Sequence, residues 1–141
     1  MARQLAGDPE IKIELLSASV RTEINLCAPH MQNDRVFLFA RLLKGLRAHC
    51  PGMIVQFSTV GRSGAGRERG GLLSVRPAMA SLTAGSNTFP TSVYENLPDR
   101  LDWLASQMQA HHVKPAIEAF DLPHIHQAAA MAADGRLSAA L

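Results

Sequence analysis

The chain has 141 residues, of which 47% are hydrophobic and 18% are charged. These proportions exclude a disordered chain and are typical of one globular domain with its own core. A net charge of +2 is too small to indicate a nucleic-acid partner, and no apolar run reaches the roughly 18 residues of a membrane-spanning helix.

The first 34 residues contain two candidate strands, 11–16 and 20–26, the second of which alternates apolar and polar side chains. An apolar stripe at three-and-four spacing predicts a helix over 36–49. The start of the chain lacks an apolar signal region. With only Cys27 and Cys50 as cysteines, we expect a cytoplasmic protein with free thiols.

The middle of the chain alternates strands with glycine-rich and helical segments. A nearly continuous apolar run over 53–60 predicts a strand that is buried on both faces, and 79–83 predicts the next strand. The loop 61–71 between them is rich in glycine and arginine, and a short helical piece is expected within 68–75. Gly85 and Asn87 then predict a turn.

The last third of the chain predicts a helix over 98–110, a strand over 114–121 and a helix from Leu122 to about residue 134. Asn96 is a candidate cap for the first of these helices. In the last helix we expect the inward side chains to be Ile125, Ala128, Ala129 and Ala132. The alternation of strands and helices predicts a parallel sheet, and both a doubly wound sheet and a (β/α)8 barrel are compatible with it.

Several polar side chains fall where these strands end, which is where α/β proteins place their chemistry. Ser81 and Thr83 close one strand, and Glu118 lies in the otherwise apolar stretch 116–120. Because a buried unpaired carboxylate is costly, Glu118 is either a site residue or the partner of an inward Arg or Lys, and the site reading is favoured.

Two other features admit more than one interpretation. Arg62, Arg67 and Arg69 of the glycine-rich loop can bind an anion such as phosphate, or the loop can be simply solvated. His124 and His126 are two residues apart at a predicted helix start, so they point to different faces, and a metal site is not expected there.

Four motifs in register then resemble the β-keto acid cleavage enzymes, the group of the 3-keto-5-aminohexanoate cleavage enzyme. The resemblance covers about residues 35–141. The motifs are Phe57-Ser-Thr-Val-Gly61, Met79-Ala-Ser-Leu-Thr-Ala-Gly-Ser86, Phe89-Pro90 with Val93-Tyr-Glu-Asn96, and Val113-Lys-Pro-Ala-Ile-Glu118 with Phe120-Asp121.

The resemblance implies a (β/α)8 TIM barrel with parallel strands that is incomplete at both ends here, with 1–34 as a divergent segment and 35–141 as partial barrel units. It implies a zinc-dependent homo-oligomer that reacts a β-keto acid with acetyl-CoA to give acetoacetate and an acyl-CoA. Carried over by position, Glu118 is the catalytic residue, and Ser58, Ser81 and Thr83 bind substrate. No nucleic acid or membrane is expected as a partner.

The departures from the family pattern concern the metal. Asn25-Leu26-Cys27 stands where the family has its His-x-His zinc ligands, so no complete metal site is predicted, although Cys27 can ligate zinc. The family's other zinc and charged residues belong to later strands. We therefore expect this chain alone to be inactive, and two alternatives stay open: a non-catalytic truncated remnant, or a small module that binds an anion or CoA.

Overall fold

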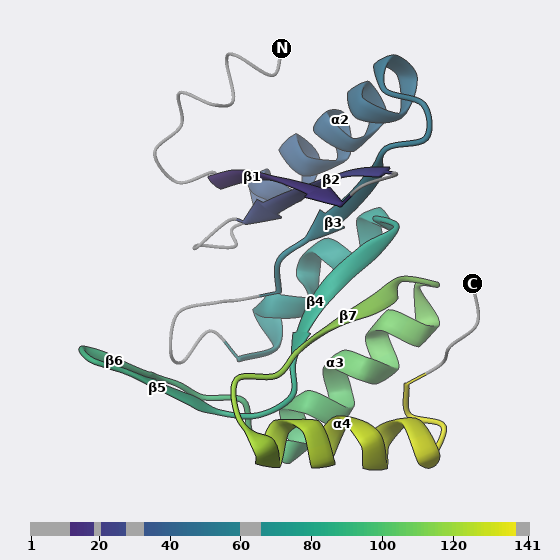
Figure 1. Cartoon of the computed structure of the whole chain (residues 1–141). Helices are drawn as coiled ribbons and strands as arrows, with labels where there is room; N and C mark the ends of the chain where they lie inside the picture. Colours follow the sequence, from purple (N-terminus) through teal and green to yellow (C-terminus); the bar gives the residue numbers. More distant parts are fainter. Residues whose placement is uncertain (1–11, 19–20, 28–32, 60–65, 138–141) are drawn as a thin grey trace.

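A mixed β-sheet with helices around it forms the centre of the computed structural model, which describes residues 12–18, 21–27, 33–59 and 66–137 (Figure 1). Within these residues the strand order is β1-β2-β3-β4-β7. Strands β2, β3, β4 and β7 run parallel, and β1 pairs antiparallel with β2. The bounds are β1 Lys12–Ala18, β2 Arg21–Cys27, β3 Ile54–Phe57, β4 Met79–Thr83 and β7 Lys114–Glu118.

The helices follow the strands in the predicted order. Their bounds are α2 Asn33–His49, the 3-10 helix η1 Gly66–Val75, α3 Pro98–Ala110 and α4 Leu122–Ala133. The predicted parallel sheet, the two early strands and the helices over 36–49 and 98–110 are confirmed. None of the helices in the described part of the chain is long and apolar enough to cross a membrane.

The parallel sheet has one apolar face, which packs on the helices. Phe39 of α2 meets Phe57 of β3 edge to face, with ring centroids 5.2 Å apart. Leu82 of β4 belongs to a second cluster with residues of α3, including the fully buried Leu104. Because successive strand side chains alternate between faces, the polar side chains of Gln56, Ser81 and Thr83 lie on the opposite face of the sheet.

The sequence did not predict a two-stranded hairpin, β5 Asn87–Phe89 and β6 Ser92–Tyr94. It follows β4, and Figure 1 shows it extending away from the sheet. The expected break after β4 is present as a bend at Ala84 and Gly85, but Asn87, which was expected in the turn, begins β5. However, the chain then re-enters extended structure as an antiparallel pair, with Pro90 at the hairpin turn.

The predicted inward face of α4 is wrong. His124 and Met131 are its buried residues, whereas Ile125 is 55% exposed and Ala129 and Ala132 are exposed. The rotation of this helix is fixed at its first turn, where the His124 ring is held between two backbone groups. The buried stripe therefore passes through His124 rather than Ile125.

Candidate functional site

Two of the predicted site residues meet directly at the carboxyl ends of neighbouring strands. Thr83 is the last residue of β4 and Glu118 the last of β7, and they are paired in the sheet register. The Thr83 hydroxyl donates to Glu118 Oε2 at 2.7 Å. Thr83 is buried and Glu118 is half-buried, so the carboxylate reaches the surface of the sheet end.

The other two predicted residues, Ser58 and Ser81, lie beside this pair. Ser58 follows β3 directly and is 9% exposed. Ser81 is fully buried, and its Oγ accepts the backbone N–H of Thr59 at 3.0 Å. The Thr59 hydroxyl in turn donates to the Ser81 carbonyl at 2.7 Å. These two bonds fasten the end of β3 to the middle of β4.

A buried arginine, which the sequence interpretation had placed in an anion-binding or solvated loop, connects these segments. Arg69 of η1 is 4% exposed. Its Nε donates to the Thr59 carbonyl at 2.8 Å and its Nη1 to Asn96 Oδ1 at 3.1 Å. Its Nη2 donates to the Tyr94 hydroxyl, and the guanidinium stacks over the Tyr94 ring at 4.7 Å. Arg69 thus joins the end of β3 to the segment that leaves the hairpin.

Burial also changes the acidity of this group. The pKa of Arg69 is lowered to about 10, mainly because burial disfavours the charged form, with Arg100 acting in the same direction and Glu118 opposing both. At neutral pH the guanidinium remains a cation. Among the described contacts its donors go to carbonyl, amide and phenol oxygens, and no carboxylate touches it.

These contacts correct the interpretation of the arginine-rich loop. An anion-binding role for Arg69 is wrong, because its guanidinium is buried and bonded within the protein. Arg67 is exposed and lies over the Trp103 ring at 5.6 Å. Arg62 falls outside the described residues.

Asn96 also has a different role from the predicted one. The N-terminal cap of α3 is Leu97, and no side chain caps that helix. Asn96 is instead 2% exposed, and its side-chain Nδ2 donates to the carbonyl of Thr83. In the sequence, Asn96 stands between Tyr94 and Pro98, shortly before the predicted helix. This position does not distinguish a helix cap from a residue that makes a tertiary contact.

His124 is a structural residue in this arrangement. Its Nδ1 accepts the backbone N–H of Phe120 at 3.2 Å, and its Nε2 lies 3.1 Å from the carbonyl of Ser86. This pattern requires the neutral ring with the proton on Nε2. The ring therefore ties the loop after β4 to the loop after β7.

The backbone of Gly85 packs so closely against the His124 ring that no side chain fits at position 85. A Cβ at position 85 would lie 2.6 Å from two atoms of the His124 ring. We expect Gly85→Ala to lower the free energy of unfolding by about 2 kcal/mol, since the ring is held on both sides and cannot move aside. Denaturant unfolding followed by circular dichroism measures this change.

The matched control is Gly45→Ala within α2, where nothing lies within 4 Å of the new Cβ. There the same substitution should stabilise the chain by about 0.5–1 kcal/mol, because alanine favours the helix. Two results would refute a clash between the new Cβ and the His124 ring. One is a Gly85→Ala variant that is as stable as this control predicts. The other is a loss of stability from Gly85→Ala that stays the same when His124→Ala has removed the ring.

The described residues do not fit a zinc site. No group of three or more His, Cys, Asp or Glu side chains among them is placed to hold a metal ion. His124 has both ring nitrogens in protein hydrogen bonds. Cys27 ends β2, and its side chain lies outside the described part.

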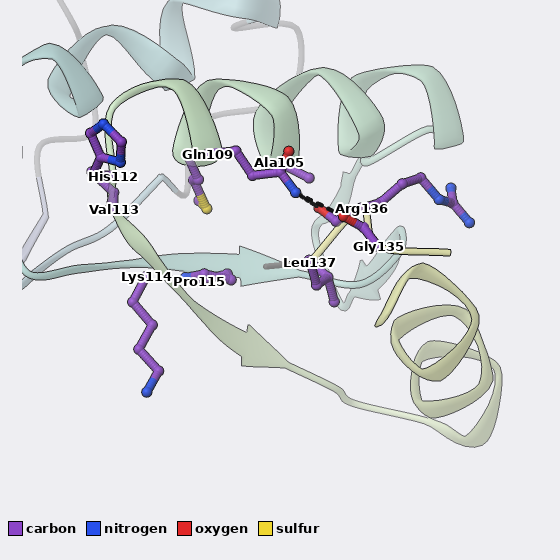
Figure 2. Close-up of a pocket in the computed structure, with 10 residues that line it drawn as sticks. Ala105, Gln109, His112, Val113, Lys114, Pro115, Gly135, Arg136 and Leu137 are labelled. Carbon is purple, nitrogen blue, oxygen red and sulfur yellow. Dashed lines mark hydrogen bonds between the residues drawn. The ribbon is translucent and has the colours of Figure 1, made fainter. Parts of the chain in front are cut away.

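Two hollows lie at opposite ends of the sheet. One, of about 330 Å³, lies by the segments that follow β4 and β7 and is lined by Ser86, Asn96 and His124 among others, but not by Thr83 or Glu118. Figure 2 shows the other, of about 400 Å³, at the amino end of β7, where the Gln109 side chain donates to the carbonyls of Gly135 and Arg136. In parallel α/β folds the chemistry is at the carboxyl ends, and the first of these two hollows lies at that end of the sheet.

Known proteins resemble this chain over most of its length. Residues 27–141 match the family model of the beta-keto acid cleavage enzyme. A curated relative from Cupriavidus necator, named 3-oxoadipate:acetyl-CoA acetyltransferase, is 52% identical over 136 residues, which are 92% of this chain and 48% of the relative. The chain thus spans about half the length of that relative. With most of its length matched by the family model, this chain belongs to the beta-keto acid cleavage enzyme family.

Proposed function

We propose that this chain carries part of the active site of an enzyme that transfers acyl groups between a β-keto acid and acetyl-CoA. The observation that carries the proposal is the Thr83–Glu118 pair at the carboxyl ends of β4 and β7, within the region matched by the family model. The name of the relative supports 3-oxoadipate as the first substrate to test. We propose that Ser58, Ser81 and Thr83 bind the keto acid.

The reaction exchanges one carbon–carbon bond for another. The bond between C2 and C3 of the keto acid breaks, and C2 joins the acetyl carbonyl carbon to give acetoacetate. The thiolate of CoA moves to the former C3 carbonyl, which leaves as the new acyl-CoA. Atoms and charge balance without an oxidant or reductant.

Glu118 is suited to move a proton in this exchange. Its Oε2 accepts from Thr83, which fixes the orientation of the carboxylate. A side chain held in this way can remove or return a proton at the carbon next to the keto group, as general acid–base catalysis requires. We propose this role for Glu118 and propose that Thr83 both orients it and contacts the substrate.

We further propose that additional units of the same family cover the edge of β7, completing a (β/α)8 barrel. In the described residues β7 has no second neighbour, and none of its residues is fully buried. Large apolar side chains are exposed around it: Ile117, Phe120, Leu122 and Ile125. Parallel strands are normally covered on both faces, so this surface suits packing against further strands and helices, in the same polypeptide or in an assembly.

The test is an isotope-tracing assay of the purified chain mixed with the half of its Cupriavidus necator relative that this chain does not match, because this chain alone is expected to be inactive. Acetyl-CoA labelled with ¹³C in both acetyl carbons is mixed with 3-oxoadipate, with and without added Zn²⁺, and the products are followed by mass spectrometry. The proposal predicts acetoacetate labelled at C3 and C4 together with an unlabelled acyl-CoA. Hydrolysis of acetyl-CoA without labelled acetoacetate, or no reaction in any condition, would contradict catalysis by this chain and favour the non-catalytic alternative.

A further inference from the structure

Asn96 lies at the junction of three segments close to the Thr83–Glu118 pair. It follows the hairpin strand β6 and precedes α3, and its side chain is almost completely buried. Its backbone N–H donates to Ser86 Oγ at 2.9 Å, and its side chain contacts Arg69 and Thr83.

The orientation of the Asn96 amide is determined by its neighbours. A guanidinium can only donate hydrogen bonds, so the atom 3.1 Å from Arg69 Nη1 must be the amide oxygen. The amide nitrogen therefore faces the carbonyl of Thr83 and donates to it. Turning the amide over would place donor against donor at Arg69 and acceptor against acceptor at Thr83.

The Thr83 carbonyl needs this donor. Thr83 is the last residue of β4 and is 2% exposed, so water does not readily replace a lost partner. The same residue uses its hydroxyl to orient Glu118, and the next residue, Ala84, donates its N–H to the Glu118 carbonyl at 3.0 Å. The peptide group held by Asn96 thus lies between two bonds that fix Glu118.

We propose that Asn96 is a positioning residue for Glu118, acting through Thr83 and anchored by Arg69. This inference rests on the proposed function only for the catalytic role of Glu118. Loss of the Asn96 amide donor should release the end of β4, so that the Thr83 hydroxyl no longer keeps its contact with the carboxylate. An exposed asparagine that only shaped the turn would have no such effect.

The decisive variant is Asn96→Asp, which keeps the shape of the side chain. Its carboxylate still accepts from Arg69 and adds an opposite charge, so the fold should be retained. The atom facing the Thr83 carbonyl becomes an acceptor, however, and that bond is lost. The NMR signal of the Glu118 carboxyl carbon should move toward its position in Thr83→Val, in which the donating hydroxyl is absent. The signal of the Thr83 methyl group should move away from its position in the unmodified chain.

The control is Asn87→Asp, the same change at the start of β5, which should leave both signals in place. A folded Asn96→Asp with unchanged Glu118 and Thr83 signals would overturn the proposal. Neither readout requires turnover, so an inactive chain in the tracing assay does not affect this test.

A second measurement needs no variant, which keeps the inference testable if Asn96→Asp does not fold. In the unmodified chain the Asn96 side-chain amide protons should exchange with solvent about tenfold more slowly than those of Asn87, as expected for a buried hydrogen bond. Equal exchange rates at the two positions would show that the Asn96–Thr83 bond does not form, and would overturn the proposal.

Discussion

Arg69→Met is expected to lower the free energy of unfolding by about 3 kcal/mol, more than Gly85→Ala. The substitution fills similar space but removes the donors that bond Thr59, Asn96 and Tyr94. A buried acceptor left without its donor costs about 1–3 kcal/mol. Relief of the cost of burying the cation offsets part of this total. Denaturant unfolding followed by circular dichroism measures the difference.

The control is Arg67→Met, on the same 3-10 helix. That side chain is exposed and is in contact with the face of Trp103, so its loss should cost about 0.5 kcal/mol. Arg69→Lys should fall between the two, because an ammonium keeps the charge but lacks the planar set of donors. Equal stabilities of Arg69→Met and Arg67→Met would show that the buried network does not hold the fold together.

Glu118→Gln is expected to lower the rate of labelled acetoacetate formation by about 10²–10⁴-fold, the range attributed to general acid–base catalysis. Glutamine keeps an oxygen that can accept from Thr83, so the local geometry is preserved and mainly the ability to take a proton is lost. The measurement is the isotope-tracing assay, with Zn²⁺ conditions matched between the two proteins.

Glu68→Gln, a change of the same kind at an exposed position of η1, should leave the rate unaltered. Because Glu118 is half-buried rather than part of the core, its replacement should leave the unfolding transition nearly in place, and the same samples can be checked for this. An unchanged rate in Glu118→Gln would remove that residue from the chemistry.

The sheet strands and most helices could be predicted from the sequence because the residue patterns that specify them lie within single elements. The apolar stripe of α2 and the Pro98 start of α3 each lie within one element, so helix period and turn chemistry were sufficient. The buried side chains of α3 are Leu101, Leu104, Ala105 and Met108, which recur at three-and-four spacing along the helix. The hairpin after β4 was missed because Gly85 and Asn87 indicate only that the strand ends.

The face of α4 was missed for a tertiary reason. The prediction placed the apolar side chains of this helix inward, whereas the buried stripe passes through His124 and Met131. The choice is made by His124, whose ring is bonded to the backbone of Phe120 and Ser86 and packed against Gly85. In the sequence, His124 and His126 suggested a pair of metal ligands, and nothing indicated that His124 lies on the buried face of the helix.

The sequence by itself determined the parallel sheet, the order of its strands and helices, and the position of Thr83 at a strand end, because strand period and chain order fix these features. The strand predicted over 114–121 ends earlier in the structure, at Glu118. Only the tertiary structure decided what holds them. Arg69 looked like a solvated loop residue and Asn96 like a helix cap, and both are instead buried beside the site. A polar side chain carries no local pattern that reveals its partners, since these come from segments 10 to 27 residues away along the chain.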